Sequence, residues 1–478
     1  MKHVNSREDS LRFSRFCHII PYDEVQGTGS VLFHSLNMET IFLNGGFFEV
    51  IEDFQYGKSL KAMKNQMEMS NGDFDTLNNL VKILLGYKML VPVQYNELEE
   101  LGEYCEKTMP GPAVNLMYLI LTDDCNYACS YCFVENGIPC DHKFSYMTPR
   151  MAKKRIDMFA EWSKKRKSKN KSLLFYGGEP LLNKPTFREA VLYYNKLKQE
   201  GGLPKIADIT IITNGSLIDK ETAEFIKNND VAVGVSIDGP EEVNDRCRTF
   251  SSSGKGTFMA VWRGYQNLLK AGIEDIGVSF TVGPHNIDNL LESTKYVVDK
   301  FSIRSLGYNI LMDSEYKVFT TRDYAEKASD EIIRCFEYLR EQGIYEDRVM
   351  RKVEFFINKK VYPNDCAACG RQFVALPTGE IGPCQAYMGS KRFFRKLQNG
   401  YSPFTSKIFK EWAYRSPLSM SQCYDCIALG LCGGGCPCRA EIRNGSIWAI
   451  DDIFCIHSKK TVNWMIKDYM RSQQQVFS

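Results

Sequence analysis

Three cysteines lie close together in the first half of the chain, at Cys125, Cys129 and Cys132. An ordinary four-iron cluster is held by four cysteine thiolates, and this loop has no fourth cysteine at ligand spacing beside it. A cubane held by three thiolates keeps one iron open to an outside ligand, as catalytic zinc sites keep one free position. The spacing therefore predicts a reactive [4Fe-4S] cluster with these three cysteines as catalytic ligands. A zinc knuckle and three buried thiols are the alternatives.

A second group of cysteines lies near the C-terminus, where nine of the seventeen fall between Cys366 and Cys455. Disulfides are disfavoured in a reducing compartment, so this density favours thiolates bound to metal or used in catalysis. Zinc prefers the same sulfur ligands and is one alternative; a disulfide framework is the other. Five cysteines have no ligand spacing, and we expect them to serve packing: Cys17, Cys105, Cys140, Cys247 and Cys335.

The composition excludes several classes of function. At 478 residues the chain is too long for one ordinary core, so two or three domains are expected. The net charge of +2 gives no general case for nucleic acid or an anionic membrane as partner. The polar start is not a secretory signal, and no apolar run is long enough to span a bilayer. We therefore expect a cytoplasmic protein.

Alternating strand and helix patterns over residues 111–345 predict an α/β domain with a parallel sheet. Six such units fit an open, partial (β/α)6 barrel, of the TIM type, better than a closed barrel of eight, and catalysis would lie at the C-terminal ends of its strands. The predicted strands are 114–122, 172–176, 209–213, 231–237, 276–282 and 306–311. The predicted helices are one that begins at Thr148 and Pro149, then 220–227, 257–271, 286–300 and 322–342.

The regions on either side of this domain have different patterns. Residues 1–110 combine short strands and three short helices, which predicts a winged-helix-like domain. The acidic stretch 97–106, with the Pro-Gly-Pro that follows it, is expected to be a linker. Residues 346–478 lose the alternation and are rich in Cys and Gly. The predicted elements of the first region are strands 30–33 and 39–43, helices 47–54, 58–69 and 73–85, and an edge strand at 89–93.

Glycine and polar residues follow the predicted barrel strands in order. Gly177-Gly178-Glu179-Pro180 follows the second strand and Thr213-Asn214-Gly215 the third; Ser236, Asp238 and then Arg248 follow the fourth. Together with the cysteine loop and its Tyr131, they resemble the radical S-adenosylmethionine (SAM) superfamily and its CxxxCxxC motif. The resemblance implies that the open iron binds the amino and carboxylate groups of SAM and that electron transfer from the cluster yields a 5′-deoxyadenosyl radical.

The resemblance also gives the strand-end residues a role in cofactor binding. Gly177, Gly178 and Glu179 would hold the amino group of SAM. Thr213 and Asn214 would reach its ribose, Ser236 and Asp238 the ribose and carboxylate, and Arg248 the carboxylate.

The C-terminal spacing resembles that of SPASM domains, which bind two auxiliary [4Fe-4S] clusters. By this resemblance the chain has three clusters, each auxiliary one with four thiolates and no open iron, which suits electron transfer or structural support. The first would take Cys366, Cys369, Cys384 and Cys436; the second would take Cys423, Cys426, Cys432 and Cys455. Cys438 is surplus to the pattern, and Gly433–Gly435 would let the backbone wrap closely around sulfur.

The first region resembles, in architecture only, the PqqD-like element that recognises precursor peptides. In that family a leader peptide adds as a strand to the sheet edge, and tethering it raises the local concentration of the core peptide. A winged helix can also bind DNA, but residues 30–94 are not strongly basic. The expected partners are thus a precursor peptide and an electron donor such as flavodoxin or ferredoxin.

The predicted function is a radical SAM/SPASM maturase of a ribosomally made peptide. It would abstract hydrogen from one residue and form an intramolecular crosslink, a Cys thioether as in sactipeptide and ranthipeptide synthases. An anaerobic sulfatase-maturating enzyme is the alternative, but those enzymes typically place Asp where this chain has Gln385. A non-catalytic iron–sulfur redox regulator is the alternative from another class. The peptide, the residue attacked and the type of bond do not follow from the sequence.

Overall fold

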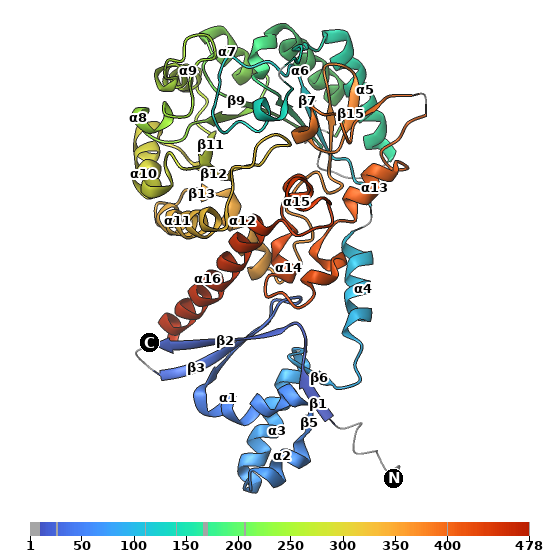
Figure 1. Ribbon diagram of the computed structural model, residues 1–478, viewed down its shortest axis with the longest axis vertical. Helices are drawn as coiled ribbons and strands as arrows, with labels where there is room; N and C mark the ends of the chain where they lie inside the picture. Colours follow the sequence, from blue (N-terminus) through green and yellow to red (C-terminus); the bar gives the residue numbers. More distant parts are fainter. Residues whose placement is uncertain are drawn as a thin grey trace.

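The computed structural model describes residues 10–24, 27–109, 111–139, 141–165, 171–204, 207–398 and 400–477. Cys140 lies outside these ranges. The chain forms three stacked parts: a front module at one end, a barrel at the other, and the cysteine-rich segment between them (Figure 1). No described helix combines the length and apolar character that crossing a bilayer requires.

The barrel is built from parallel strands in sequence order, each followed by a helix that returns along the outside. Its strands are β7 (Leu116–Ile120), β8 (Ser172–Tyr176), β9 (Asp208–Thr213), β10 (Val231–Ser236), β11 (Ile276–Val282) and β12 (Ser305–Ile310). Its helices are α5 (Pro149–Lys165), α6 (Lys184–Gln199), α7 (Lys220–Asn228), α8 (Glu241–Asn244), α9 (Phe258–Lys270), α10 (Leu290–Phe301) and α11 (Arg322–Glu341). The predicted parallel α/β sheet is confirmed, and so is the start of α5, where Thr148 Oγ1 accepts from the Met151 amide at 3.3 Å.

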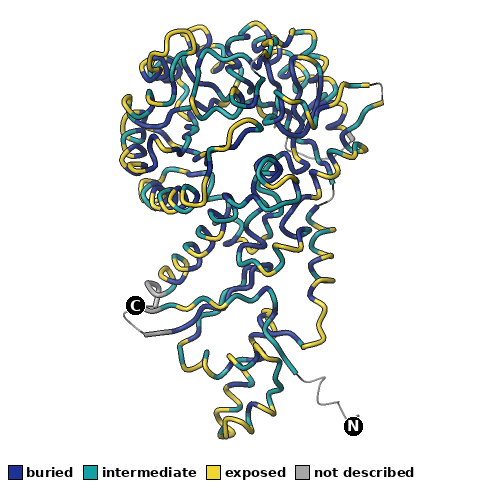
Figure 2. Tube along the Cα trace, in the orientation of Figure 1, coloured by how far each residue is buried: buried dark blue, intermediate teal, exposed yellow. Residues whose placement is uncertain are grey.

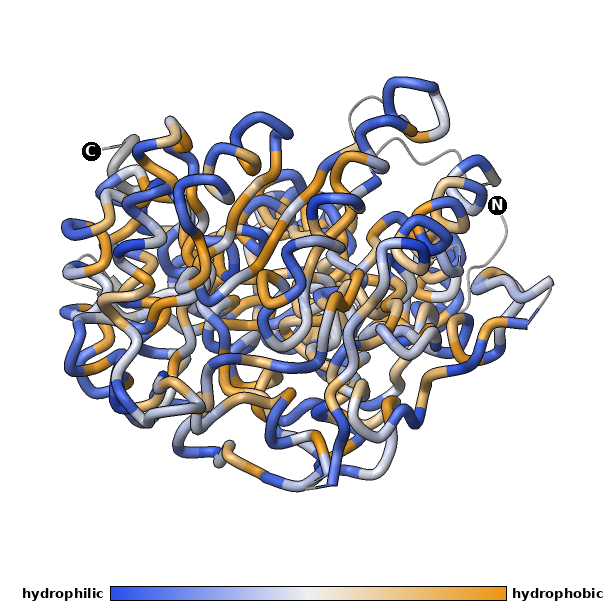
Figure 3. Tube along the Cα trace, turned by 90° about the horizontal axis from the view of Figure 1, so that it is seen from above, coloured by the Kyte–Doolittle hydropathy of each residue, from blue (hydrophilic) through white to orange (hydrophobic). Residues whose placement is uncertain are grey.

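Strands of the cysteine-rich segment extend the barrel sheet at both ends. The order is β13-β12-β11-β10-β9-β8-β7-β14-β15-β16. β14 runs parallel to β7, with Gln372 beside Leu116, so the cysteine-rich segment shares the sheet with the barrel. Strands and inner helix faces are buried (Figure 2), and hydrophilic positions gather around the outside (Figure 3). Such burial of apolar surface is the main stabilising contribution to a domain of this kind.

The elements of the cysteine-rich segment are short until its last helix. They are β13 (Tyr345–Glu346), α12 (Asp347–Ile357), β14 (Gln372–Ala375), β15 (Glu380–Gly382), β16 (Arg395–Lys396), α13 (Lys407–Ala413), α14 (Leu429–Cys432), α15 (Pro437–Asn444) and α16 (Asp452–Phe477). α16 packs on α11 and reaches from the barrel side to the front module (Figure 1).

The front module contains two small antiparallel sheets and a group of helices. One sheet has the order β2-β3-β4 and the other β5-β1-β6. Its strands are β1 (Ser10–Phe13), β2 (Cys17–Glu24), β3 (Gly27–His34), β4 (Thr40–Asn44), β5 (Lys58–Ser59) and β6 (Leu90–Pro92), and its helices are α1 (Gly45–Ile51), α2 (Leu60–Gln66) and α3 (Asn71–Gly86). The three predicted helices and the edge position of the strand containing Pro92 are confirmed; β1 and β2 were not predicted.

The expected linker at 97–106 is instead a helix, α4 (Glu97–Thr108). Its first turn carries Glu97, Glu99 and Glu100, and its last turn carries Lys107, which is the arrangement that the helix dipole favours. Leu101 is buried against Phe16, Leu36 and Leu429, so the acidic stretch has one apolar contact face. The connection between front module and barrel is therefore packed and regular.

Candidate active site

The two glycines after β8 lie against the backbone that leads into the cysteine loop. A Cβ atom on Gly177 would come within 2.1 Å of the Thr122 carbonyl oxygen, and one on Gly178 within 2.0 Å of that of Asp124. The Gly178 amide donates to Thr122 O at 3.0 Å and the Glu179 amide to Asp124 O at 2.8 Å. Glycine is required here because any side chain would push the ends of β7 and β8 apart.

Glu179 is fully buried and joins the ends of β8 and β9. Its carboxylate accepts hydrogen bonds from Thr213 Oγ1 at 2.7 Å, the Asn214 amide at 2.7 Å and the Leu181 amide at 3.0 Å. Burial raises its pKa, although these donors act in the opposite direction. The Asn214 side chain then donates to Asn126 Oδ1 at 2.8 Å, inside the cysteine loop. Thr213, Asn214 and Glu179 thus fix one another behind that loop.

Tyr131, Asp238 and Arg248 form a connected group on the other side of the cysteine loop. The Tyr131 hydroxyl donates to Asp238 Oδ2, and Arg248 donates to the Tyr131 oxygen at 2.9 Å. Asp238 also accepts from the Thr281 amide at 2.9 Å. The Arg248 side chain is buried and its Nε has no partner among the described residues, so this N–H on the edge of the guanidinium is available to a carboxylate.

His285, which the sequence did not single out, completes this group. Its ring stacks on Tyr131 at 5.5 Å, and its Nε2 lies 3.4 Å from Asp238 Oδ2. Burial lowers the pKa of His285, but hydrogen bonds and charge from Asp238 and Cys247 outweigh burial and raise it to about 9. For Asp238, burial acts to raise the pKa of the carboxyl. The hydrogen bond from His285 and the charges of Arg248 and His285 outweigh burial and bring this pKa below its usual value. Two cations against one carboxylate make this corner suited to an anionic group.

The cysteine loop itself is held by the segment that follows Asp238. The amides of Ala128 and Ser130 donate to Thr249 O at 2.9 Å and Cys247 O at 3.0 Å. The Tyr127 amide points at Cys125 Sγ, 3.4 Å away. Burial raises the pKa of the thiols of Cys125, Cys129 and Cys132. These contacts suit thiolates bound to iron, since amide donors to sulfur are usual around such clusters. Ser236, at the end of β10, pairs with Ser279 of β11.

The structure brings the C-terminal cysteines together in the two predicted sets. Burial raises the pKa of Cys366, and its neighbours Cys369, Cys436 and Cys384 add to the rise. Cys438 is buried beside Cys384 and Cys436, which places the surplus cysteine at this first set. Gln385 accepts from Gln372 Nε2 at 3.2 Å. We call the four predicted ligands Cys366, Cys369, Cys384 and Cys436 auxiliary site 1.

Auxiliary site 2 is a cavity between α14 and the start of α16. Its walls include the four predicted ligands Cys423, Cys426, Cys432 and Cys455, together with Phe454. A Cβ on Gly433 would meet the Asp365 amide nitrogen at 2.3 Å, so this glycine allows the backbone of residue 365 to approach closely, while wrapping around sulfur stays a prediction. In the described residues, no three His, Cys, Asp or Glu side chains converge on a site for a single metal ion. Each site does offer four cysteine thiols, which is the ligand type and number that a four-iron cluster takes.

The family model of the radical SAM superfamily matches residues 119–297. This chain is a radical SAM enzyme. The match runs from β7 into α10 and thus includes the cysteine loop, the glycines after β8 and the Asp238 group.

Relatives of this radical SAM enzyme match far more than the barrel. The radical SAM cyclopropyl synthase TigE of Paramaledivibacter caminithermalis is 26% identical over 97% of this chain and 97% of its own. A structure of native anSMEcpe with bound AdoMet superposes with a TM-score of 0.63 at 21% identity, covering 76% of this chain and all of that one. A structure of SuiB of Streptococcus suis bound to its precursor peptide SuiA superposes with a TM-score of 0.51 at 15% identity. It covers 93% of this chain and 99% of that one. At these identities the two structures show the likeness of fold alone.

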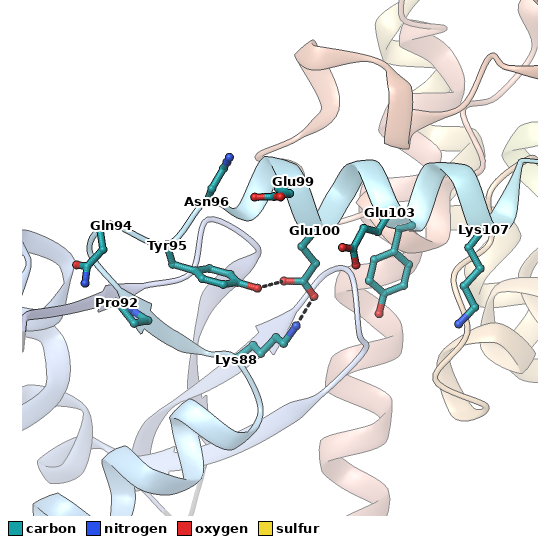
Figure 4. Close-up of a pocket in the computed structure, with 10 residues that line it drawn as sticks. Lys88, Pro92, Gln94, Tyr95, Asn96, Glu99, Glu100, Glu103 and Lys107 are labelled. Carbon is teal, nitrogen blue, oxygen red and sulfur yellow. Dashed lines mark hydrogen bonds and ion pairs between the residues drawn. The ribbon is translucent and has the colours of Figure 1, made fainter. Parts of the chain in front are cut away.

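The radical SAM enzyme also has a hollow of about 800 Å³ on its front module, between α4 and the turn after β6 (Figure 4). Glu100 of α4 accepts hydrogen bonds there from Lys88 at 2.6 Å and from Tyr95 at 3.1 Å. None of the residues predicted to bind SAM or iron lines this hollow. It is separate from the three cysteine sites.

Proposed function

We propose that this radical SAM enzyme modifies a ribosomally made peptide by hydrogen abstraction followed by an intramolecular crosslink. The observation that carries the proposal is the match with TigE over nearly the whole chain, front module included. The fold of SuiB, a protein solved with its precursor peptide, extends over the same range and supports the same layout. A barrel alone would supply the radical chemistry without a module to select a peptide.

In the barrel, Cys125, Cys129 and Cys132 would hold the cluster, and their fourth corner would be open to SAM. When bound, this cluster supplies the electron that splits SAM into methionine and the 5′-deoxyadenosyl radical. Arg248, with its unpartnered Nε, would hold the carboxylate of SAM, and His285 would add positive charge beside it. Glu179 keeps Thr213 and Asn214 in place, so in our proposal it orients the ribose and amino contacts through these neighbours.

The two auxiliary sites would each hold a further [4Fe-4S] cluster, giving three in all. Closing a crosslink releases one electron and one proton, and a cluster without an open iron suits the role of electron acceptor. A flavodoxin or ferredoxin would then exchange electrons with the enzyme.

We propose three domains, with boundaries at 1–110, 111–345 and 346–478. The first would be a winged-helix-like, PqqD-like precursor recognition element. Its sheet ends at β2 and β4, so within the described residues both strands have one side without a strand partner. A leader peptide could add as a strand there, because main-chain hydrogen bonds give affinity and side-chain pockets give selection.

The bond formed is proposed to be a Cys thioether, and a carbon–carbon bond is the second candidate. The second candidate rests on a specific observation, the likeness to a cyclopropyl synthase over 97% of the chain. Both products lack one hydrogen at each coupled atom and so have the same mass. They differ in their cysteines, because a thioether consumes a thiol that a carbon–carbon bond leaves free.

The test is to search the neighbouring reading frames for a short peptide, to co-express it with the enzyme, and to record mass spectra before and after alkylation of thiols. A peptide that loses one hydrogen pair and one alkylation site supports a thioether. A peptide that loses the hydrogen pair and keeps every alkylation site supports a carbon–carbon bond. Formation of 5′-deoxyadenosine with dithionite and SAM, but with no peptide altered, would contradict the proposal.

A further inference from the structure

Lys352 of α12 is a buried cation without a hydrogen-bond acceptor. Its side chain has no exposed surface, and its Nζ makes no hydrogen bond. The nearest carboxylate oxygen, Asp365 Oδ1, lies 3.8 Å away, which is too far for a hydrogen bond. That oxygen already accepts from the Tyr362 hydroxyl at 3.1 Å. Burying an ammonium without an acceptor is strongly unfavourable, so the structure needs a further negative partner here.

The position of Lys352 identifies that partner. Its Nζ lies 4.9 Å from the centre of the Phe454 ring, and Phe454 lines the same cavity as Cys432 and Cys455. From the other side, the Asp365 amide donates to Gly433 O at 2.8 Å, directly after Cys432. The ammonium is therefore enclosed between α12 and the wall of auxiliary site 2.

A second buried group, on α16 just after Cys455, also lacks a partner. Both ring nitrogens of His457, two residues after Cys455, are buried without a hydrogen bond. Lys352 and His457 are thus two buried groups near these cysteines with polar atoms that no described protein atom satisfies.

We propose that Lys352 stabilises the reduced form of the auxiliary cluster at site 2 and so sets its reduction potential. This inference rests on the proposed function, because it needs a cluster on Cys423, Cys426, Cys432 and Cys455. One-electron reduction of such a cluster adds one negative charge. A buried ammonium beside it favours the reduced form, since net charge and hydrogen bonds to sulfur set the potentials of these clusters. Lys352 is then a positioning residue that makes site 2 the better acceptor of the electron released on crosslinking.

The competing role for Lys352 is a purely structural ion pair with Asp365. The two roles predict opposite effects on the chain without iron. If the ammonium is an unpaired charge awaiting a cluster, Lys352→Met removes a buried charge and raises the melting temperature of the iron-free protein. If the ion pair with Asp365 instead holds α12 in place, Lys352→Met lowers the melting temperature of the iron-free protein.

The experiment is a redox titration of the reconstituted full-length enzyme, followed by electron paramagnetic resonance. The signal of site 2 is assigned by its loss in Cys455→Ala. In Lys352→Met, and in Lys352→Gln should the first variant fold poorly, the ratio of reduced to oxidised cluster at a fixed poise falls about tenfold, which is 59 mV for one electron. Lys171→Met is the matched control, because Lys171 is equally buried but donates to Val114 O at 3.2 Å.

The outcomes separate this inference from the proposed function. A full iron content with an unchanged site 2 potential in both Lys352 variants overturns the inference alone. An iron content that is the same with and without Cys455 overturns the cluster at site 2, and the inference with it. A lowered potential in the Lys352 variants, with Lys171→Met unchanged, supports both.

Discussion

Gly178 shows how one missing side chain sets the position of the cysteine loop. Replacing it by Ala puts a methyl group 2.0 Å from the Asp124 carbonyl, and a backbone oxygen next to Cys125 has to move. We expect Gly178→Ala to cost about 1–3 kcal/mol of stability and to lower iron bound at the loop and the rate of SAM cleavage. Gly277→Ala in β11 is the control, because its nearest contact is an ordinary 3.6 Å. Normal iron and cleavage in Gly178→Ala would contradict the role given to this contact.

His34 makes the front module sensitive to acid. Its Nδ1 accepts from the amides of Leu36 and Asn37, so the ring is neutral in the folded state. Burial, followed by the charges of His18 and Lys88, lowers its pKa from 6.5 to about 3. The unfolded chain therefore takes up this proton at a higher pH than the folded one, and stability falls as pH drops below 6.5.

Acidification from neutral pH to about pH 4 should remove about 3 kcal/mol of stability through this one residue. His34→Asn keeps an acceptor for the two amides but carries no titrating group. Urea unfolding of the front module at several pH values measures the difference. If the variant loses stability with acid as steeply as the parent chain, the effect arises at other residues.

Several site residues were accessible from sequence because motif and strand position agree. Two short apolar strands are followed by turn residues that carry site residues. The first is followed by the three-cysteine loop, the second by Gly177, Gly178 and Glu179, and the structure places these segments side by side. His285 was missed because a single histidine in a loop carries no spacing signal. Its link to Asp238 appears only when the ends of β10 and β11 meet. The carboxylate of Glu179 accepts hydrogen bonds from neighbouring protein groups, and its predicted contact with the amino group of SAM stays a prediction.

At the scale of elements, α4 joins the front module to the rest through one buried carboxylate. Glu97 accepts from Arg12 at 2.6 Å, from Ser14 Oγ at 2.5 Å and from the Arg15 amide at 3.0 Å. Glu97→Ala leaves these donors unpaired, and we expect a loss of about 3–5 kcal/mol. Hydrogen exchange should then rise in α4 and β1. Glu99→Ala, on the exposed side of α4, is the control, and equal protection in the two variants would show that Glu97 does not hold the helix.

The same element shows where sequence patterns mislead. The acidic run of α4 has the composition of a linker, but Leu101 supplies one buried contact that only the folded partner surface reveals. β2 (Cys17–Glu24) contains Pro21 and ends in two acidic residues, so its pattern does not indicate a strand. This segment is a strand because all eight of its residues pair with β3, and tertiary context outweighs strand propensity. The barrel strands were predictable since each is a short apolar run between helical patterns.

At the scale of the whole molecule, the front module rests directly on the loop of auxiliary site 2. The Gly430 amide donates to Ser35 O at 2.9 Å, and a Cβ on Gly430 would lie 2.5 Å from that oxygen. Around this contact, Phe33 and Met38 of the module form one apolar cluster with Leu431 and Val462. A precursor held by the module would therefore stay at a fixed distance from the barrel.

Gly430→Val should separate these surfaces without touching the barrel. SAM cleavage without peptide is expected to continue at the normal rate, whereas peptide modification falls about tenfold or more because the effective concentration of the core peptide drops. Both rates come from one assay of 5′-deoxyadenosine and modified peptide. Gly102→Ala in α4, where an added methyl group meets nothing within 4 Å, is the control. An equal fall of both rates would place the damage at the cysteine sites, and normal rates for both would mean that docking of the module is not needed to present the peptide.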